Sequence, residues 1–567
     1  MRDSTEIRVL QDLLGLNRRL HGDQLCLIDP IDRARVAEGA ARRLTWRALG
    51  ERIDRLALTL AQAGLGKGDI VLLVAPTLHE TLAAQLACLE LGVVVASIPV
   101  QYREGEVDAL IERLSPRALI GHVRLGSHAN AAMLAGAARR SPRAPMVFGF
   151  GEGLPEGVRG LDLDAPLNGA ERMALDGFRS AAAVVPDDLA FIVFTSGTSA
   201  RPKAVPRSHA DILAVRRFLE DVAELPVGGC FLSPRMLNTI GSLANGLAAW
   251  LYSAARMVLH HPFDLDVFLR QIAEERPEVT SCPPAILNMI LRRIEAGEAL
   301  DMGALHHITS GSAQLDPRLM SAFRERFGIT LVNIYGSSEG AMLIASDKDI
   351  AHEEIRARCF LRHAEGQAGS RLPVLEGTRT RLVDPATEVE ITNPGTIGEL
   401  RLKSPAILRR YWDDPELTQA SFDEGGWFRT GDLFEIAGEQ GQYLSFTGRL
   451  KNIIVRGGLN ISAEEIQGLA ITHPAVAEAV AVPVPDARLG EQVGLAVVLR
   501  PGAVLRLPEL CAHLRSECKV AVYKLPEHLR LLDALPTMPS GKTDLQAIRA
   551  LFASDPRAGS GPIKEKP

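Results

Sequence analysis

The segment FIVFTSGTSARPKAVPRSH contains the residue types that hold a polyphosphate. An apolar stretch runs into Thr195, Ser196, Gly197 and Thr198, and Lys203 follows shortly after. Small hydroxyl residues around a glycine expose backbone N–H groups and side-chain hydroxyls in one concavity, and a lysine adds positive charge. The segment lacks a GK[ST] triplet and a strand is expected to follow it, so it is not a Walker A loop. The alternative interpretation is a plain polar hairpin loop.

A second segment, ITLVNIYGSSEG, predicts a strand that ends in a tight turn at Gly336, Ser337, Ser338 and Glu339. GSSEG matches the GxSxG pattern of a hydrolase nucleophile elbow, which requires a helix after the turn. The next residues, AMLIAS, are typical of another strand or loop. A second interpretation makes Glu339 a magnesium ligand beside a phosphate, because this ion is usually held by a carboxylate and substrate oxygens. A purely structural turn is the third.

A third region, WFRTGDLFEI followed by GRLKNIIVRGG, carries charges and glycines around predicted β-turns. Asp432 follows a glycine and is placed like an acceptor for sugar hydroxyls. Arg449 and Lys451 lie on a turn between two β segments. Gly457 and Gly458 allow the close approach of another backbone or of a thin ligand. An ordinary β-turn with solvated charges is the alternative interpretation.

Lys542 lies in a Pro/Ser/Gly-rich loop, LPTMPSGKTD, near the end of the chain. Its GKT imitates the end of a Walker A motif, but the required first glycine falls on Pro536, so that motif is rejected. The chain has ten lysines against 53 arginines, so a lysine in a glycine-containing loop is informative. Arginine cannot replace the compact ammonium charge of lysine. A surface turn is the default interpretation for a lone lysine.

The elements that would position these residues alternate between helix and strand. Thr45 is expected to cap a helix whose apolar residues follow the helical repeat. Residues 70–76, 79–91 and 93–99 are expected to form strand, helix and strand, and such a unit in about 30 residues predicts a right-handed crossover in a parallel sheet. The same alternation of helix and strand is expected over 211–340, and short strands with turns are expected from about residue 370.

These patterns predict an α/β protein with two folded domains. We expect a large N-terminal body over 1–448, made of stacked α/β subdomains plus a β-rich subdomain. A small C-terminal α+β domain would occupy 449–554, and 555–567 would be a disordered tail.

Composition supports a globular protein and excludes several functional classes. A chain of 567 residues with 46% hydrophobic and 23% charged residues fits two or more ordinary domains. The net charge of −6 gives no case for binding nucleic acid or an anionic membrane. No apolar run reaches 18 residues, and the charged N-terminus lacks a signal-peptide core. The seven cysteines are odd in number and form no CxxC pair, which predicts free thiols and a cytoplasmic location.

Together these segments resemble one family. TSGTSARPKAV, NIYGSSEG, RTGDL, GRLKNIIVRGG and PSGKTD look like the core motifs of the adenylate-forming superfamily of acyl-CoA synthetases, adenylation domains and luciferases. The resemblance covers nearly the whole chain, from TWRALGERIDRLALTLAQAGLGKGD to PSGKTD. It implies a large N-terminal domain, a mobile C-terminal domain and an active site between them. It also implies ATP, Mg²⁺ and a thiol acceptor.

The resemblance implies which residues surround the phosphates. Residues 195–203 would bind the phosphates of ATP. Ser338, with Gly336 and Ser337 beside it, would hydrogen-bond the α-phosphate, and Glu339 would hold the magnesium ion. A carboxylate that attacks an α-phosphate approaches like charge, so lysine, metal and N–H donors are what this reaction requires.

The resemblance also implies roles for residues farther from the phosphates. Asp432 would bind the ribose hydroxyls, with Arg449 close by. Lys451 would be the hinge between the domains, and Lys542 the catalytic lysine of the first half-reaction. Adenine would lie against a set of five residues: Gly311, Ser312, Ala313, Asn333 and Tyr335.

The chain departs from the family pattern in two places around the phosphates. Ala200 and Ala204 stand where family members usually have glycine, which predicts a stiffer phosphate loop. Ser338 replaces the commoner threonine and keeps the hydroxyl.

The segment FLSPRMLNTIGSLANG matches the acid pocket of the family. Leu237 stands at the usual histidine or aromatic position, followed by Asn238, with Gly241 nearby. Residues 231–246 contain no acidic side chain, which argues against an amino-acid substrate because its ammonium group needs a carboxylate partner. PRSHADILAVRRFLEDV and AVYKLPEHL look like the aryl-acid branch, in which an asparagine near position 238 meets a ring hydroxyl. An aryl or cyclic acid is therefore favoured, with medium-chain acids open.

The acceptor thiol would pass Gly457 and Gly458. Coenzyme A is favoured, and the pantetheine arm of an acyl or aryl carrier protein is the alternative, in which case the chain is a stand-alone aryl-acid adenylation enzyme. A serine hydrolase that uses Ser338 is a third hypothesis. A degenerate nucleotide- or acyl-binding paralogue, motivated by Ala200, Ala204 and Leu237, is the fourth.

Overall fold

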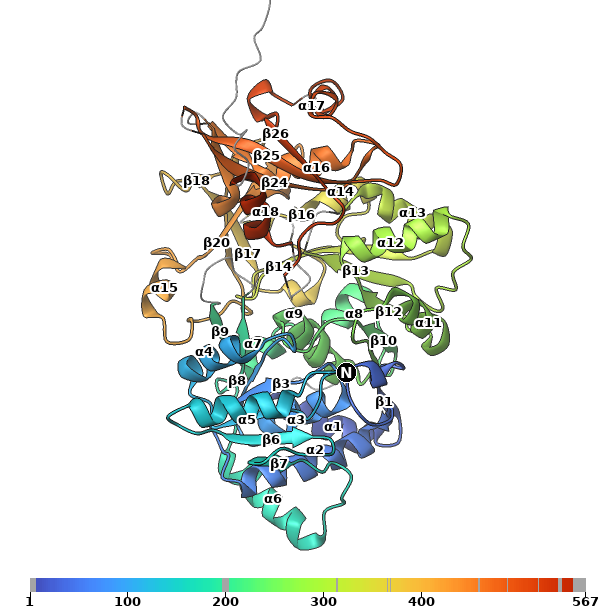
Figure 1. The fold of residues 1–567 in the computed structure, drawn as a ribbon, viewed down its shortest axis with the longest axis vertical. Coiled ribbons are helices and arrows are strands. Elements are labelled where there is room, and N and C mark those ends of the chain that lie inside the picture. The colour runs from blue at the N-terminus through green and yellow to red at the C-terminus, as the bar shows by residue number, and fades with distance from the viewer. Residues whose placement is uncertain are drawn as a thin grey trace, which may run out of the picture.

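Four β-sheets organise the described residues of the computed structural model, and Figure 1 shows the blue N-terminal elements at one end and the orange C-terminal elements at the other. The structure describes residues 7–195, 203–312, 315–364, 366–367, 369–456, 459–486, 488–518, 520–538 and 543–553.

The first sheet contains the predicted crossover unit. Strands β3 and β4 are parallel, with Ile70 opposite Val94, and α3 connects them. The hydroxyl of Thr45 accepts a hydrogen bond from the amide of Ala48 at 3.2 Å and thereby caps α2, as its sequence predicts. The strand order is β7 (Val158–Gly160), β6 (Met146–Phe150), β5 (Ala118–His122), β3 (Ile70–Val74), β4 (Val94–Ser97), β8 (Leu189–Phe194), β9 (Ala204–Ser208). The helices of this region are α2 (Trp46–Gln62), α3 (His79–Glu90), α4 (Glu104–Leu114), α5 (Asn130–Arg140) and α6 (Gly169–Ala182).

The second sheet repeats the α/β rhythm over the middle of the chain. Its order is β15 (Met342–Ala345), β14 (Thr330–Gly336), β13 (His307–Gly311), β12 (Val279–Ser281), β10 (Cys230–Ser233), β11 (Arg256–Leu259), β1 (Leu25–Ile28), β2 (Arg43–Thr45). Its helices are α1 (Leu10–His21), α7 (His209–Leu213), α8 (Phe218–Ala223), α9 (Ile240–Ser242), α10 (Ala249–Ser253), α11 (Leu265–Glu275), α12 (Pro284–Glu295) and α13 (Pro317–Phe327). The N-terminal strand β1 joins this sheet by pairing in parallel with β11, with Leu27 opposite Met257.

The third sheet is antiparallel, as the short strands after residue 370 predict. Its order is β16 (Cys359–Leu361), β21 (Tyr443–Arg449), β20 (Phe428–Ala437), β19 (Ile397–Lys403), β17 (Arg379–Val383), β18 (Glu390–Ile391). Two short helices belong to this part of the chain: α14 (Glu353–Arg358) precedes β16, and α15 (Pro415–Ala420) lies between β19 and β20.

A smaller C-terminal sheet has its own apolar core, built on Ile454, Ile466, Val493 and Leu510. Its strands are β22 (Ile453–Arg456), β23 (Leu459–Ser462), β24 (Val476–Asp486), β25 (Gly490–Leu499) and β26 (His528–Leu532), with α16 (Ala463–Ile471), α17 (Leu507–Ser516) and α18 (Leu545–Ala553).

The α/β fold class with a large N-terminal body and a smaller C-terminal domain is confirmed. The domain boundary at residue 448 stays a prediction, and the predicted tail over 555–567 lies outside the described residues. Among the helices that the structure describes, none combines the length and apolar composition that crossing a bilayer requires. All seven cysteines are free; four are buried and three are half-buried.

Candidate active site

The carboxyl ends of four parallel strands form the edge where the predicted adenine residues lie. Strands β10, β12, β13 and β14 are parallel neighbours, so the residues that follow them meet at one edge of the sheet, where open α/β sheets bind ligands. Gly311 ends β13, and a Cβ atom there would lie 2.5 Å from the carbonyl oxygen of Ile334 on β14. Only glycine therefore allows this close approach of the strands.

Tyr335 and Asp432, from different sheets, meet beside this edge. The Tyr335 hydroxyl donates a hydrogen bond to Oδ2 of Asp432 at 2.7 Å. Nε of Arg449 lies 3.0 Å from Oδ1 of the same carboxylate. Both oxygens keep a further lone pair, so the carboxylate can still accept hydrogen bonds from a ligand.

Burial tunes the acidity of this pair. Burial raises the pKa of Asp432, and the positive charge of Arg449 acts in the opposite direction. Burial, reinforced by the charge of Asp432, raises the pKa of Tyr335 well above its usual value. The phenol is therefore a hydrogen-bond donor at neutral pH, and it fixes the orientation of the carboxylate.

Asn333 is anchored to the end of α14. Its Nδ2 donates hydrogen bonds to the carbonyl oxygens of Ala357 at 2.9 Å and of Arg356 at 3.3 Å. Its amide oxygen can still accept a hydrogen bond from a ligand, and the exocyclic amino group of adenine is a suitable donor. Ser312, next to Gly311, has a φ of 75°. Ala313 lies outside the described residues.

The turn after β14 is not a nucleophile elbow. It closes an antiparallel hairpin with β15, in which Gly336 lies opposite Met342. A strand therefore follows Ser338 where a hydrolase requires a helix, as AMLIAS predicts. Gly340 has a φ of 97°, and a Cβ atom there would lie 1.8 Å from the carbonyl oxygen of Ala406, so the turn tolerates only glycine.

Glu339 is buried and has no ion pair among the described residues. One of its carboxylate oxygens, Oε1, accepts a hydrogen bond from the hydroxyl of Tyr411 at 2.9 Å. Its backbone oxygen accepts one from Nη1 of Arg207 at 3.1 Å, which fixes the turn to β9. The ammonium of Lys203 lies over the ring of Tyr411, 5.2 Å from its centre. Tyr411 therefore connects the predicted metal ligand to the predicted phosphate-binding lysine.

Two hydroxyl groups near these residues lack partners. Oγ1 of Thr195 and Oγ of Ser337 are buried without a hydrogen-bond partner in the described part of the chain. Thr195 begins the loop that closes the β8–β9 hairpin, where Phe194 lies opposite Ala204. Unpartnered buried donors are costly, so they fit a site that a ligand completes. Ser196, Gly197 and Thr198 of this loop lie outside the described residues.

Lys451 is close enough to the site to respond to its charges. It lies on a one-turn 3₁₀ helix, Leu450–Asn452, between β21 and β22. Partial desolvation lowers the pKa of its ammonium group, and the charges of Arg449 and Lys203 add to this shift. Glu339 acts in the opposite direction. The predicted hinge residue therefore lies in the electrostatic field of the predicted phosphate and metal residues.

The predicted acid-pocket segment lies between the first and second sheets. Leu237 and Asn238 line a small cavity with residues that follow β3 and β4, such as Thr77 and Ile98. Oδ1 of Asn238 is buried there, and no described residue donates a hydrogen bond to it. Gln85 of α3 donates from Nε2 to the carbonyl oxygen of Leu237 at 2.7 Å, which fixes the segment to the first sheet.

Sequence reasoning missed Tyr411, Arg207 and Gln85. Tyr411 is 72 residues from its partner Glu339 in the sequence, and Arg207 is 132 residues from it. Gln85 is 152 residues from its partner Leu237. Arg207 lies within the predicted phosphate-binding segment, but no pattern there indicates that it bonds to the turn of Glu339. Tyr411 and Gln85 lie outside every segment that the sequence singled out for the site. Gly457, Gly458 and Lys542, which the sequence did single out, lie outside the described residues.

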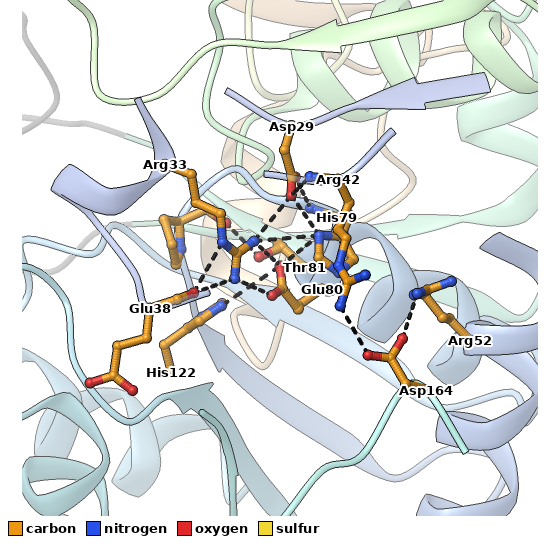
Figure 2. Close-up of polar contacts among 11 residues, drawn as sticks. Asp29, Arg33, Glu38, Arg42, Arg52, His79, Glu80, Thr81, His122 and Asp164 are labelled. Atoms are coloured by element: carbon orange, nitrogen blue, oxygen red, sulfur yellow. Dashed lines mark hydrogen bonds and ion pairs between the residues drawn. The ribbon is translucent and has the colours of Figure 1, made fainter. Parts of the chain in front are cut away.

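A second polar cluster joins Asp29, which follows β1, to the first two residues of α3 (Figure 2). Asp29, His79 and Glu80 are buried with ligand atoms within 4.8 Å of one another, as in a metal site. Nη1 of Arg33, however, donates to Asp29 at 3.1 Å and to Glu80 at 2.9 Å. The guanidinium supplies the positive charge that a metal would bring, so the cluster is a structural ion network.

Family comparisons agree with the geometry. The model of the AMP-binding enzyme family matches residues 19–412, and that of the AMP-binding enzyme C-terminal domain matches 465–542. The medium-chain fatty-acid–CoA ligase of Escherichia coli is 28% identical over 519 residues, covering 91% of this chain and 87% of that protein. The indoleacetate–CoA ligase of Aromatoleum aromaticum is 30% identical over 513 residues, covering 90% of this chain and 94% of that protein.

A solved structure shares the fold. The ATP-bound MatB of Rhodopseudomonas palustris superposes with a TM-score of 0.75 at 24% identity, covering 96% of this chain and 99% of that one. The chain therefore belongs to the AMP-binding enzyme family, the adenylate-forming superfamily that its motifs resemble.

Proposed function

We propose that the chain activates a carboxylic acid with ATP and transfers the acyl group to a thiol. One observation carries the proposal: Tyr335 and Asp432, 97 residues apart, form a hydrogen bond at the sheet edge that ends in the turn of Glu339. The acid is aryl, cyclic or medium-chain, and the thiol is that of coenzyme A, as in the names of the relatives above. A carrier-protein pantetheine is the alternative acceptor.

In the first half-reaction an oxygen of the acid attacks the α-phosphorus of ATP. The bond from that phosphorus to the bridging oxygen of the β-phosphate breaks, and pyrophosphate leaves. Asp432 binds the ribose hydroxyls, and Ser338 hydrogen-bonds the α-phosphate. The hydroxyls of Thr195 and Ser337 also donate to phosphate oxygens. Lys203 and Lys542 neutralise the charge that the attack brings together. This reaction requires positioning and charge neutralisation more than covalent help from the protein.

The residues present fit a magnesium ion. Glu339 is a buried carboxylate whose only described side-chain partner is the neutral hydroxyl of Tyr411. A buried carboxylate without a cationic partner is costly, and Mg²⁺ with its phosphate oxygens would compensate it. The bound ion would supply positive charge to the phosphates, while Tyr411 keeps the carboxylate oriented.

In the second half-reaction the sulfur of the thiol attacks the acyl carbon. The bond between that carbon and the phosphate oxygen breaks, AMP leaves, and the thiol proton passes to solvent. The thiol reaches the acyl group past Gly457 and Gly458, after the domain over 449–554 turns about Lys451. The domain over 1–448 keeps the adenylate bound.

The test of the proposal is acid-dependent exchange of labelled pyrophosphate into ATP, screened over a panel of carboxylic acids. We expect one class of acid to support exchange, and thioester to form when coenzyme A is added. Fluorophosphonate labelling of Ser338 without ATP would support the hydrolase hypothesis instead. ATP binding without exchange for any acid would support the degenerate paralogue.

The metal assignment predicts the behaviour of Glu339→Gln. The substitution keeps the shape and removes the charge, so adenylate formation slows and the magnesium concentration for half-maximal rate rises about tenfold, equivalent to about 1.4 kcal/mol. The measurement is pyrophosphate exchange across a magnesium titration. Glu325→Gln, on the exposed face of α13, is the matched control. Wild-type rates across the titration would make Glu339 a turn residue only.

The acid pocket predicts the behaviour of Asn238→Leu. If the unpartnered Oδ1 accepts a hydrogen bond from a ring hydroxyl, its loss leaves that hydroxyl unsatisfied, at a cost of about 1–3 kcal/mol. Selection for a hydroxylated ring acid over its plain analogue should fall by roughly one to two orders of magnitude. The measurement is exchange with paired acids. Equal loss for both acids would show that Asn238 supports the loop.

A further inference from the structure

Arg235 lies two residues after the end of β10, at the same sheet edge as the proposed adenylate site. Its Nε and Nη2 donate hydrogen bonds to Oγ of Ser281, at 3.0 and 2.8 Å. Ser281 is the last residue of β12, the neighbour of β10 in the sheet. The guanidinium therefore lies across the carboxyl ends of two parallel strands, where α/β sheets bind their ligands.

The positive charge of Arg235 has no counter-charge among the described residues. The side chain of Arg235 is half-buried, its described partner is a neutral hydroxyl, and partial desolvation lowers the pKa of the guanidinium. Arg33 and Arg401, by contrast, are buried against carboxylates. A cation that loses water without gaining an opposite charge is costly, so such a group points to an anion that binds from outside.

The remaining nitrogen of Arg235, Nη1, lies beside Gly241. A Cβ atom at Gly241 would lie 3.0 Å from Nη1, and this nitrogen has no hydrogen-bond partner in the described part of the chain. Gly241 belongs to the acid-pocket segment, and residues 231–246 include no acidic side chain. The free N–H groups of Arg235 therefore lie beside the predicted acid-pocket segment, two residues before Leu237 in the chain.

We propose that Arg235 binds a second carboxylate on the substrate, so that the preferred acid is a dicarboxylic acid. One carboxylate reacts with ATP, and the other accepts hydrogen bonds from Nη1 of Arg235. Planar N–H donors match a carboxylate, and such charge-assisted hydrogen bonds are among the strongest in proteins. The inference rests on the proposed function, and it narrows the substrate class.

The test compares mono- and dicarboxylates of the same skeleton in pyrophosphate exchange. The pairs are benzoate with the three benzene dicarboxylates, hexanoate with adipate, and octanoate with suberate. We expect the wild type to prefer the dicarboxylate in at least one pair. Arg235→Gln should lower the kcat/KM for that acid about 10- to 100-fold, and leave the KM for ATP and the rate with the monocarboxylate within about twofold.

Two further variants separate substrate binding from structural support. Ser281→Ala removes the described partner and keeps the charge, so a loss of preference is not expected. Arg235→Lys keeps the charge if Arg235→Gln fails to fold, and should retain part of the preference. Thermal unfolding reports the folded state of each variant.

Two results would overturn the inference. One is a wild-type preference for the monocarboxylate in every pair, and the other is an equal loss with both acids in Arg235→Gln. Either result leaves the proposed function intact, since an acid still supports exchange. Failure of every acid in the wild type, with ATP still bound, would instead overturn the proposed function.

Discussion

Lys542→Ala is expected to abolish detectable adenylate formation, a loss of about 10²–10³-fold or more, while thioester formation from a supplied acyl-adenylate continues at nearly the wild-type rate. Attack of a carboxylate on the α-phosphate brings two negative groups together, and a lysine ammonium stabilises that transition state. The second half-reaction does not require a carboxylate to approach the α-phosphate. PSGKTD matches the family loop that supplies this lysine, and the residue lies outside the described part of the structure.

The measurement is pyrophosphate exchange for the first half-reaction and thioester formation from synthetic adenylate for the second. Lys524→Ala is the matched control. Lys524 belongs to the same C-terminal region, and its ammonium pairs with Glu465 at 2.8 Å. Equal damage to both half-reactions in Lys542→Ala would contradict its assignment to the first step.

Arg33→Met is expected to lower the free energy of unfolding by about 3–5 kcal/mol, because it leaves Asp29 and Glu80 buried without a positive charge. The side chain of Arg33 is 5% exposed, so water cannot replace the guanidinium. Urea unfolding followed by tryptophan fluorescence measures the change. Arg35→Met is the matched control: its side chain is 53% exposed, and such an ion pair contributes about 1 kcal/mol or less.

The loss in Arg33→Met should depend on pH. Burial by itself raises the pKa of Glu80, but His122 and Arg33 hold it well below its usual value. A lowered folded-state pKa contributes stability above the unfolded-state pKa, and this contribution disappears as the pH falls through the folded-state value. The difference between wild type and variant is therefore largest at neutral pH and narrows in acid. A constant difference down to pH values below the ordinary glutamate range would contradict the role of Glu80.

Local sequence patterns were sufficient to predict the helices and strands, and to predict which residue types the site contains. The unbroken apolar run over 70–76 predicts a strand of a parallel sheet, and β3 forms one over its first five residues. Thr45 predicts the start of α2, and AMLIAS predicts a strand after Ser338. These predictions succeed because caps, apolar period and turn glycines act between near neighbours in the chain. The order of the five motifs along the chain identified the family, since five spaced motifs rarely occur together by chance.

Long-range contacts required the tertiary structure. No pattern in β1 indicates that Leu27 lies beside Met257, and no pattern in Tyr411 indicates that it orients Glu339. The missing counter-charge of Arg235 is likewise a property of its surroundings and has no signal in the sequence. Local sequence determines elements because each depends on a few adjacent residues. Charge pairing, burial and hydrogen-bond satisfaction depend on what packs from elsewhere in the chain, so only the folded arrangement decides them.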